Sequence, residues 1–490
     1  MLCIEKGTIV SPKESFKGNL YIEGEKIRRI FRESEQKEET AFLESLQEEP
    51  ERIDAEGRLL FPGFIDCHTH FELHVAGTVT CDDFPSGTKA AIAGGTTSIV
   101  DFGTQYKGET LMEGFHNWQK KADKGASCDY GFHMSITDWN ESSKKECQKM
   151  MDEGLSTFKI YMTYDIQVDD EEMFEILEEL KRVGGITGVH CENTGMIAAL
   201  QKELISDPKT KARVSSHYLS RPDDAEAEAI NRMLYIANVV DTPIIDVHLT
   251  CEKGLNEIRE ARKRGQTVFA ETCPQYLTMT EDLYKSEDFL TSARYVIAPP
   301  LRKKSDQEAL WKALADGEIQ TVCTDHCSFT LEQKGLGKED FRKIPGGMPG
   351  VETRGEVIFS EGVVKGRITK ERMCALLSEN PAKLYGMYPE KGVLLEGSDA
   401  DIVILNPNKK KTITKETQVS RSDYAPLEGL EVQGVIEEVY LRGQLVAKEG
   451  KVVKENRGRE LKGKKISIRS VRIFLTSLIF SLYILFFFKS

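Results

Sequence analysis

The chain has 490 residues, more than the roughly 100 to 150 of one small domain, so it holds several domains or a large barrel-type domain with an attachment. Hydrophobic residues make up 40% and charged residues 30%, as is typical of soluble globular proteins, which excludes a mostly disordered chain. The 66 basic and 79 acidic residues give a net charge of −13, which repels phosphate and argues against nucleic acid as a target.

The cysteines indicate a reducing location. Eleven of them are scattered from Cys3 to Cys374, and an odd number cannot pair completely within one chain. The N-terminal sequence MLCIEKGTIVSPKE also lacks the apolar run of a signal peptide. We therefore expect the protein to be cytoplasmic.

Both ends of the chain contain short stretches with the composition of strands. These stretches are residues 2–10, 19–31, 397–405 and 435–446. We expect the two separated segments, residues 1–56 and 388–460, to form one small composite β-sandwich domain.

Between these segments, apolar β-branched runs alternate with helical stretches, which is the pattern of repeated βα units. Eight runs are present, at residues 59–70, 96–104, 128–137, 157–165, 185–192, 243–251, 267–274 and 319–327. Helical periodicity is clear at residues 171–184 and 223–240. Eight units over residues 57–387 predict an α/β fold, a (β/α)8 TIM-type barrel.

Polar residues lie where catalytic residues of such a barrel are found, at the C-terminal ends of its strands. The candidate metal ligands in five of the eight runs are His68, His70, Lys159, His190, His248 and Asp325. The sequence therefore predicts a metal site on one rim of the barrel.

The histidines carry most of this prediction. His68 and His70 are two positions apart on a strand, so both imidazoles lie on one face and can bind one metal ion. Two surface histidines produce the same spacing, and a lone His190 or His248 at a strand end is commonly a structural residue. The clustering of four of the nine histidines with Asp325 favours a metal site over separate structural roles.

Lys159 does not fit a metal site in its ordinary form. An ammonium group repels cations and has no lone pair to donate, so an ion pair is the alternative role. A lysine carbamylated by CO₂ would instead supply two carboxylate oxygens, enough to bridge two metal ions about 3.5 to 4 Å apart. The residues alone leave both possibilities open.

Over about residues 1–460, the chain resembles the dihydropyrimidinase and D-hydantoinase family of cyclic amidohydrolases. The resemblance rests on ten segments in the family's order: GFIDCHTHFE, GGTTSIVDF, TFKIYMTYD, GVHCEN, VHLTC, ETCPQYL, APPLR, CTDHCSF, MPGVETR and GSDADIVIL. It implies a hydrolase that opens a dihydropyrimidine, such as 5,6-dihydrouracil, or a 5-substituted hydantoin to an N-carbamoyl amino acid.

The resemblance also implies two divalent metal ions, with Zn²⁺ the expected identity. His68 and His70 would bind the more buried ion and His190 and His248 the more exposed one, while carbamylated Lys159 would bridge them.

Asp325 would bind the more buried ion and act as general acid and base. A bridging hydroxide would attack the ring carbonyl, and the Tyr164 hydroxyl would stabilise the oxyanion.

The expected substrate-binding positions are Tyr164, Ala298 and Gly346. The family usually contacts the ring imide through the backbone at a serine and at an asparagine, where this chain has Ala298 and Gly346. Backbone contacts survive such side-chain changes, but the preferred ring stays open.

Two alternative functions remain. Met348 and Glu352 resemble residues of related enzymes, so an allantoinase-like or dihydroorotase-like reaction stays open, although no arginine follows His68 as far as His74 to hold a substrate carboxylate. The alternative of another class is a non-catalytic scaffold homologue. Such a homologue lacks metal ligands, whereas all six positions are filled here.

The last predicted segment, residues 461–490, combines a basic linker with a hydrophobic tail. Residues 473–488 (IFLTSLIFSLYILFFF) are almost wholly apolar, and as a helix they would rise about 24 Å, less than a hydrocarbon core of about 30 Å. Two interpretations stay open: a C-terminal membrane anchor, or an incidental extension or segment buried in an oligomer. The family resemblance implies a homotetramer or homodimer.

Overall fold

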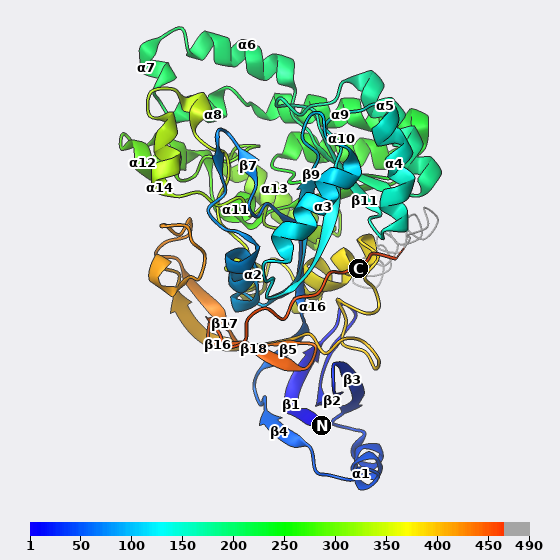
Figure 1. Ribbon diagram of the computed structural model, residues 1–490. Coiled ribbons are helices and arrows are strands. Elements are labelled where there is room, and N and C mark those ends of the chain that lie inside the picture. Colours follow the sequence, from blue (N-terminus) through cyan, green and yellow to red (C-terminus); the bar gives the residue numbers. More distant parts are fainter. Residues whose placement is uncertain (465–490) are drawn as a thin grey trace.

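The computed structural model describes residues 1–464. Two sheets organise this part of the chain, one of eight parallel strands and one of nine strands, and they lie end to end in Figure 1.

The eight-stranded sheet is the barrel. Its strands are β6 (Phe64–Thr69), β9 (Thr96–Thr104), β10 (Asp129–Ser135), β11 (Thr157–Tyr161), β12 (Ile186–His190), β13 (Ile244–Asp246), β14 (Val268–Thr272) and β15 (Thr321–Val322). Neighbours in sequence are neighbours in the sheet, and all these pairs are parallel. A parallel bridge between Thr69 and His326 joins the first strand to the chain after the last. Each predicted run contains one barrel strand, so the predicted barrel is confirmed.

The helices that separate these strands are amphipathic or buried, and capping residues mark where they begin and end. They are α2 (Phe84–Ala93), α3 (Leu111–Ala122), α4 (Glu141–Asp152), α5 (Asp170–Val183), α9 (Asp223–Val240), α10 (Glu252–Lys263) and α13 (Lys304–Ala315). In α5, for example, Asp169 accepts a hydrogen bond from Glu172 N, and Gly184 ends the helix at φ 89°. The helical periodicity at residues 171–184 and 223–240 corresponds to α5 and α9.

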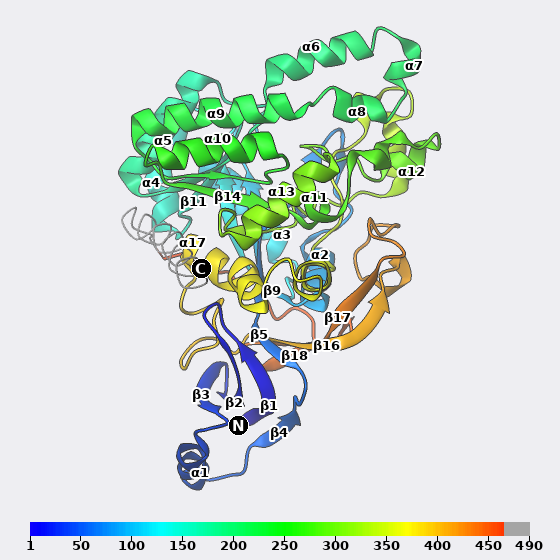
Figure 2. The same cartoon turned by 180° about the vertical axis from the view of Figure 1, so that it is seen from behind.

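Further helices occupy the remaining connections. They are α6 (Thr194–Leu204), α7 (Pro208–Lys211), α8 (Ser215–Leu219), α11 (Pro274–Thr278), α12 (Phe289–Ala293), α14 (Leu331–Lys334), α15 (Arg354–Ile358), α16 (Lys370–Cys374) and α17 (Asn380–Leu384). Figure 2 shows α6 and α7 lying outside α8 and α9. A two-stranded hairpin of β7 (His74–Val75) and β8 (Thr78–Val79) follows the first barrel strand.

The nine-stranded sheet is built from both ends of the chain, which confirms the predicted composite β domain. Its strands are β1 (Leu2–Val10), β2 (Ser15–Glu23), β3 (Lys26–Arg32), β4 (Glu51–Asp54), β5 (Leu59–Pro62), β16 (Ile402–Thr412), β17 (Glu431–Leu441), β18 (Gln444–Lys448) and β19 (Lys451–Val452). The small helix α1 (Gln36–Glu44) lies at its far end in Figure 1.

The predicted run at residues 59–70 supplies strands to both sheets. β5 pairs with β1 and β16 of the nine-stranded sheet, whereas β6 opens the barrel. The chain crosses between them at Gly63, where a Cβ would lie 2.0 Å from Thr97 Oγ1, so only glycine fits without displacing the barrel.

A buried lysine fastens the two sheets together. Lys391 Nζ contacts a carboxylate oxygen of Asp129 at 2.5 Å, of Asp399 at 2.7 Å and of Asp401 at 2.8 Å. Asp129 begins barrel strand β10, and Asp401 precedes β16 of the other sheet. The ammonium group neutralises a carboxylate cluster that would otherwise repel itself.

No helix within residues 1–464 combines the length and apolar character needed to cross a membrane. The hydrophobic tail predicted at residues 473–488 lies outside the described residues.

Candidate active site

The barrel brings the four predicted histidine ligands into one cluster. The ring centroids of His68 and His70 are 5.2 Å apart, those of His68 and His248 5.4 Å, and those of His190 and His248 4.6 Å. All four side chains are buried, and burial lowers the pKa of His68 and His248 well below the usual value. The imidazoles of His68 and His248 are therefore neutral near pH 7 and keep a lone pair for a cation.

Asp325 joins this cluster from the opposite end of the strand order. Its Oδ1 lies 3.3 Å from His68 Nε2 and 3.0 Å from His70 Nε2. The ligand atoms of these three residues lie within 4.8 Å of one another, so one cation can contact all three. His68, His70 and Asp325 therefore form a candidate metal site.

Lys159 is 1% exposed, and its amine has no hydrogen-bond partner within residues 1–464. Nζ lies 5.3 Å from the ring centroid of Phe102 and 5.2 Å from that of Tyr161. Burial lowers the pKa of Lys159 to about 8. The ion pair that was its alternative role is not formed to any described carboxylate, so the amine is isolated, and its lowered pKa gives it a larger neutral fraction near pH 7 than an ordinary lysine has.

Two glutamates that were not among the predicted site residues orient the histidines. Glu271 Oε1 lies 2.6 Å from His68 Nδ1, so the Nε2 atom of His68 is the one that faces Asp325. Glu192 Oε2 lies 2.8 Å from His190 Nε2, which leaves Nδ1 of His190 as its free nitrogen. Carboxylates that bind the second nitrogen of a histidine fix the orientation of that ligand toward a metal.

Arg221 extends this chain of contacts toward Tyr164. Its guanidinium lies 2.5 Å from Glu192 Oε2 and 5.4 Å from the centroid of the Tyr164 ring, which is itself 5.1 Å from the His190 ring. Burial acts to raise the pKa of Glu192, but the charge of Arg221 and the hydrogen bond from His190 lower it to about 2. Glu192 is therefore ionised, and predicted Tyr164 lies beside the histidine cluster.

The backbone is strained at the site. Tyr164, His248 and Asp325 have φ angles of 73°, 45° and 52°, in the left-handed region that residues other than glycine rarely adopt, although histidine and aspartate enter it more often than tyrosine does. Such conformations cost about 1 to 3 kcal/mol each and persist where the surrounding structure enforces them. Three of the predicted site residues share this strain.

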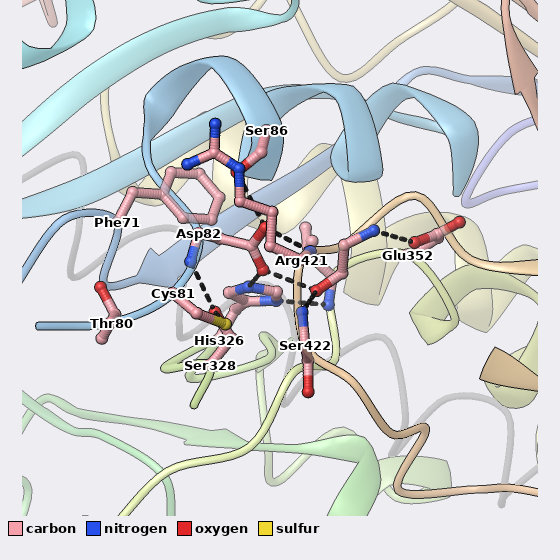
Figure 3. A network of polar contacts seen from close by, with 12 residues as sticks. Phe71, Thr80, Cys81, Asp82, Ser86, His326, Ser328, Glu352, Arg421 and Ser422 are labelled. Carbon is pink, nitrogen blue, oxygen red and sulfur yellow. Dashed lines mark hydrogen bonds and ion pairs between the residues drawn. The ribbon is translucent and has the colours of Figure 1, made fainter. Parts of the chain in front are cut away.

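His326 points away from the metal ligands, as alternation along a strand predicts for the neighbour of Asp325. Its Nδ1 accepts hydrogen bonds from Gly350 N at 3.1 Å and Val351 N at 3.3 Å. Its Nε2 donates to Asp82 Oδ2 at 3.1 Å, and Figure 3 shows the two side chains facing each other. The histidine therefore ties the chain beside Asp325 to the loop that follows the hairpin.

The same region is fastened to a loop of the nine-stranded sheet domain. Asp82 also accepts hydrogen bonds from Ser420 Oγ at 2.6 Å and Arg421 N at 2.9 Å. Glu352 accepts from Val419 N at 2.8 Å and Ser420 N at 3.2 Å (Figure 3). Burial raises the pKa of Glu352 to about 7, against the effect of these backbone hydrogen bonds.

The two predicted backbone-binding positions lie next to each other. A Cβ placed on Gly346 would lie 3.8 Å from the N and Cβ atoms of Ala298. Within residues 1–464, the peptide N–H and C=O of both residues have no hydrogen-bond partner. Ala298 is half-buried and Gly346 is exposed, and a bridge between His326 and Met348 places this loop beside the chain that follows Asp325.

Comparison with known proteins agrees over nearly the whole chain. The model of the Amidohydrolase family matches residues 59–446. The chain is 39% identical to a D-hydantoinase of Geobacillus stearothermophilus over 454 residues, covering 92% of this chain and 93% of the relative. It is 40% identical to a D-phenylhydantoinase of Escherichia coli (strain SE11) over 465 residues, covering 94% and 98%.

Solved structures have the same fold. The crystal structure of a dihydropyrimidinase from Brevibacillus agri NCHU1002 aligns with a TM-score of 0.90 at 39% identity, covering 95% of this chain and 99% of the other. An L-hydantoinase (dihydropyrimidinase) from Arthrobacter aurescens aligns with a TM-score of 0.83 at 29% identity, covering 94% and 99%.

Proposed function

Because the chain belongs to the amidohydrolase family, we propose that it hydrolyses a cyclic amide, a dihydropyrimidine such as 5,6-dihydrouracil or a 5-substituted hydantoin, to an N-carbamoyl amino acid. The observation that carries this proposal is the isolated amine of Lys159 within a cluster of four histidines and an aspartate. The convergence of all six ligand positions argues against a non-catalytic scaffold.

The residues fit a centre of two divalent ions. His68, His70 and Asp325 offer one set of ligand atoms. His248 lies against His68, and His190 lies against His248, so these two histidines offer a second set. The neutral, unpartnered amine of Lys159 is the form that reacts with CO₂, and a carbamate there would supply two oxygens between the sets. Zn²⁺ suits a set of nitrogen and carboxylate ligands. When bound, such ions act as Lewis acids and make water a strong nucleophile near neutral pH.

Asp325 is placed to move protons. Its carboxylate is held between His68 and His70 on a strained backbone, which fixes the direction of its oxygens. In the proposed reaction Asp325 accepts a proton from the attacking water and delivers it to the ring nitrogen as the C–N bond breaks. The products are the carboxylate and the carbamoyl amine of the opened ring.

Tyr164 is placed to stabilise negative charge on the ring carbonyl oxygen. Its ring packs beside His190, with the positive charge of Arg221 near its face. A hydroxyl that donates to an oxyanion stabilises the transition state more than the neutral substrate.

The peptide groups of Ala298 and Gly346 are suited to hold the ring. A cyclic ureide or imide presents alternating N–H donors and C=O acceptors along one edge, and a pair of free peptide groups presents the complementary pattern. These contacts use only the backbone, so they tolerate alanine and glycine at the two positions.

The proposal is tested by metal analysis together with hydrolysis of dihydrouracil and 5-substituted hydantoins, on the parent chain and on Lys159→Ala. We expect about two metal ions per parent chain, and both turnover and metal to be lost in Lys159→Ala. Lys144→Ala, which removes an exposed lysine of α4, is the matched control and should behave like the parent. Metal binding without turnover of either ring would overturn the substrate assignment, and full metal content in Lys159→Ala would overturn the bridging role.

The homotetramer or homodimer implied by the resemblance stays a prediction. The molar mass of the protein in solution, measured by light scattering, tests it.

A further inference from the structure

Lys334, the last residue of α14, is a fully buried lysine outside the candidate metal centre. Its side chain is 0% exposed. The amine donates to Val296 O at 2.8 Å, to Pro345 O at 2.7 Å and to Gly347 O at 2.7 Å. An ammonium group has three donors, so these carbonyls use all of them.

No carboxylate within residues 1–464 forms an ion pair with this amine, whose hydrogen-bond partners are the three carbonyls and whose Nζ lies 5.5 Å from the centroid of the Phe329 ring. Burying a charge without a counterion is costly. A lysine that only filled space could be replaced by an apolar residue of the same length, so the contacts to the carbonyls are what this residue specifically provides.

The three carbonyls flank the two free peptide groups described above. Val296 lies two residues before Ala298, and Pro345 and Gly347 lie on either side of Gly346. Gly347 N also donates to Val296 O at 2.9 Å, so the two loops are joined directly as well as through Lys334. The amine therefore holds backbone carbonyls that lie one or two residues from Ala298 and Gly346.

The helix that carries Lys334 is itself anchored to the rim. Gln333 Nε2 donates to Thr78 Oγ1 at 2.8 Å and to Val79 O at 2.6 Å, in the hairpin that follows the first barrel strand. Leu331 N donates to Asp423 Oδ1 at 2.8 Å. Lys334 thus projects from a base that is fixed to two other segments.

The loop of residues 345–347 is closely packed against a neighbouring segment. Gly347 has φ 156°, and a Cβ on it would lie 2.3 Å from Cys327 O, so the backbone is pressed against the chain that follows Asp325. This close contact is kept only if residues 345–347 do not shift, and a partner that binds their carbonyls prevents such shifts.

We propose that Lys334 is a positioning residue that sets the spacing of the Ala298 and Gly346 peptide groups and so determines how well the substrate ring is bound. This inference rests on the proposed function, because the bound ring is the cyclic amide proposed above. Lys334 touches neither the predicted metal ligands nor the reacting atoms, so its effect is on ring binding and not on the chemical step.

The test compares Lys334→Met with Lys338→Met, which removes an exposed lysine four residues later. We expect KM for dihydrouracil to rise at least 10-fold in Lys334→Met, with kcat within about threefold of the parent and metal content unchanged. Lys338→Met should match the parent in all three quantities. An unchanged KM in Lys334→Met, or a loss of metal and kcat together, would overturn the positioning role.

A second readout does not depend on activity. Amide hydrogen exchange should accelerate in peptides covering residues 293–301 and 344–350 of Lys334→Met, but not of Lys338→Met; equal exchange in both variants would reject the inference. A parent chain that turns over no cyclic amide, yet shows this difference, would refute the proposed substrate and leave the loop-holding role intact. If Lys334→Met does not fold, Lys334→Gln keeps two of the three donors and should show the same changes to a smaller extent.

Discussion

Glu271 Oε1 lies 2.6 Å from His68 Nδ1, on the side of the imidazole opposite the nitrogen that faces Asp325. Both side chains are almost completely buried, so water does not compete for this contact. The carboxylate fixes the ring orientation of His68, and with it the direction of the lone pair offered to a cation.

Replacing Glu271 by glutamine should therefore weaken metal binding while preserving the fold. Glutamine has the same shape but lacks the charge that makes the imidazole a better ligand, and such changes typically reduce metal affinity or activity about 10- to 100-fold. Titration of the metal-free protein with Zn²⁺ measures the effect. Glu260→Gln, on the exposed face of α10, is the control and should not change the affinity.

Arg221 should matter for turnover although it binds no metal in the proposed centre. Replacing it by methionine removes the partner of Glu192 and the cation beside Tyr164, so both His190 and the tyrosine lose support. We expect kcat/KM to fall about 10- to 100-fold. Steady-state hydrolysis measures it, with the exposed Arg213→Met as control. A variant with parental kcat/KM would show that Arg221 serves only the stability of the loop.

The barrel and the composite sheet were predictable because both leave a local record in the sequence. Parallel barrel strands are buried on both faces and read as continuous apolar runs, and each of the eight runs contains a strand. In the run at residues 59–70, the prediction of a barrel strand was wrong only for the first part, which forms β5 of the nine-stranded sheet. Nothing local distinguishes Leu59–Pro62 from a barrel strand, because pairing with β16, which lies more than 300 residues away, assigns it to the other sheet.

The candidate ligands were predictable for a similar reason, since each lies within a barrel strand or within three residues of its C-terminal end. The residues that support them were not. Glu192 lies in the same run as His190, and Glu271 lies in a run without a predicted ligand. The role of both depends on which nitrogen of a histidine faces them, which only the folded barrel decides. Arg221 and Lys334 lie in connecting segments, where no periodicity marks their burial.

The buried cluster around Lys391 should dominate the stability of the junction between the two sheets. Lys391→Met leaves the carboxylates of Asp129, Asp399 and Asp401 without their cation, and breaking such a buried pair costs about 3 to 5 kcal/mol. Urea unfolding measures the loss. Lys26 pairs with the same Asp399 from an exposed position, so Lys26→Met should cost less than about 1 kcal/mol. Equal losses in the two variants would contradict a special role for the buried lysine.

Glu352 should make stability depend on pH near neutrality. Its pKa is about 7 in the folded chain against an ordinary value of 4.5. Between these values the folded chain holds a proton that the unfolded chain has released, so the contribution of Glu352 to the free energy of unfolding falls as pH rises from about 4.5 to about 7, and then stays constant.

Glutamine cannot ionise, so Glu352→Gln lacks this loss. The free energy of unfolding of Glu352→Gln minus that of the parent should therefore increase between pH 5 and pH 7.5, by about 1 to 3 kcal/mol. Urea unfolding at a series of pH values measures the difference, in which the titration of all other groups cancels. Glu416→Gln, an exposed residue near the same loop, should give a difference that hardly varies with pH over this range. If the difference for Glu352→Gln is equally flat, then the carboxylate is ionised at pH 5 and Val419 and Ser420 bind a permanent charge.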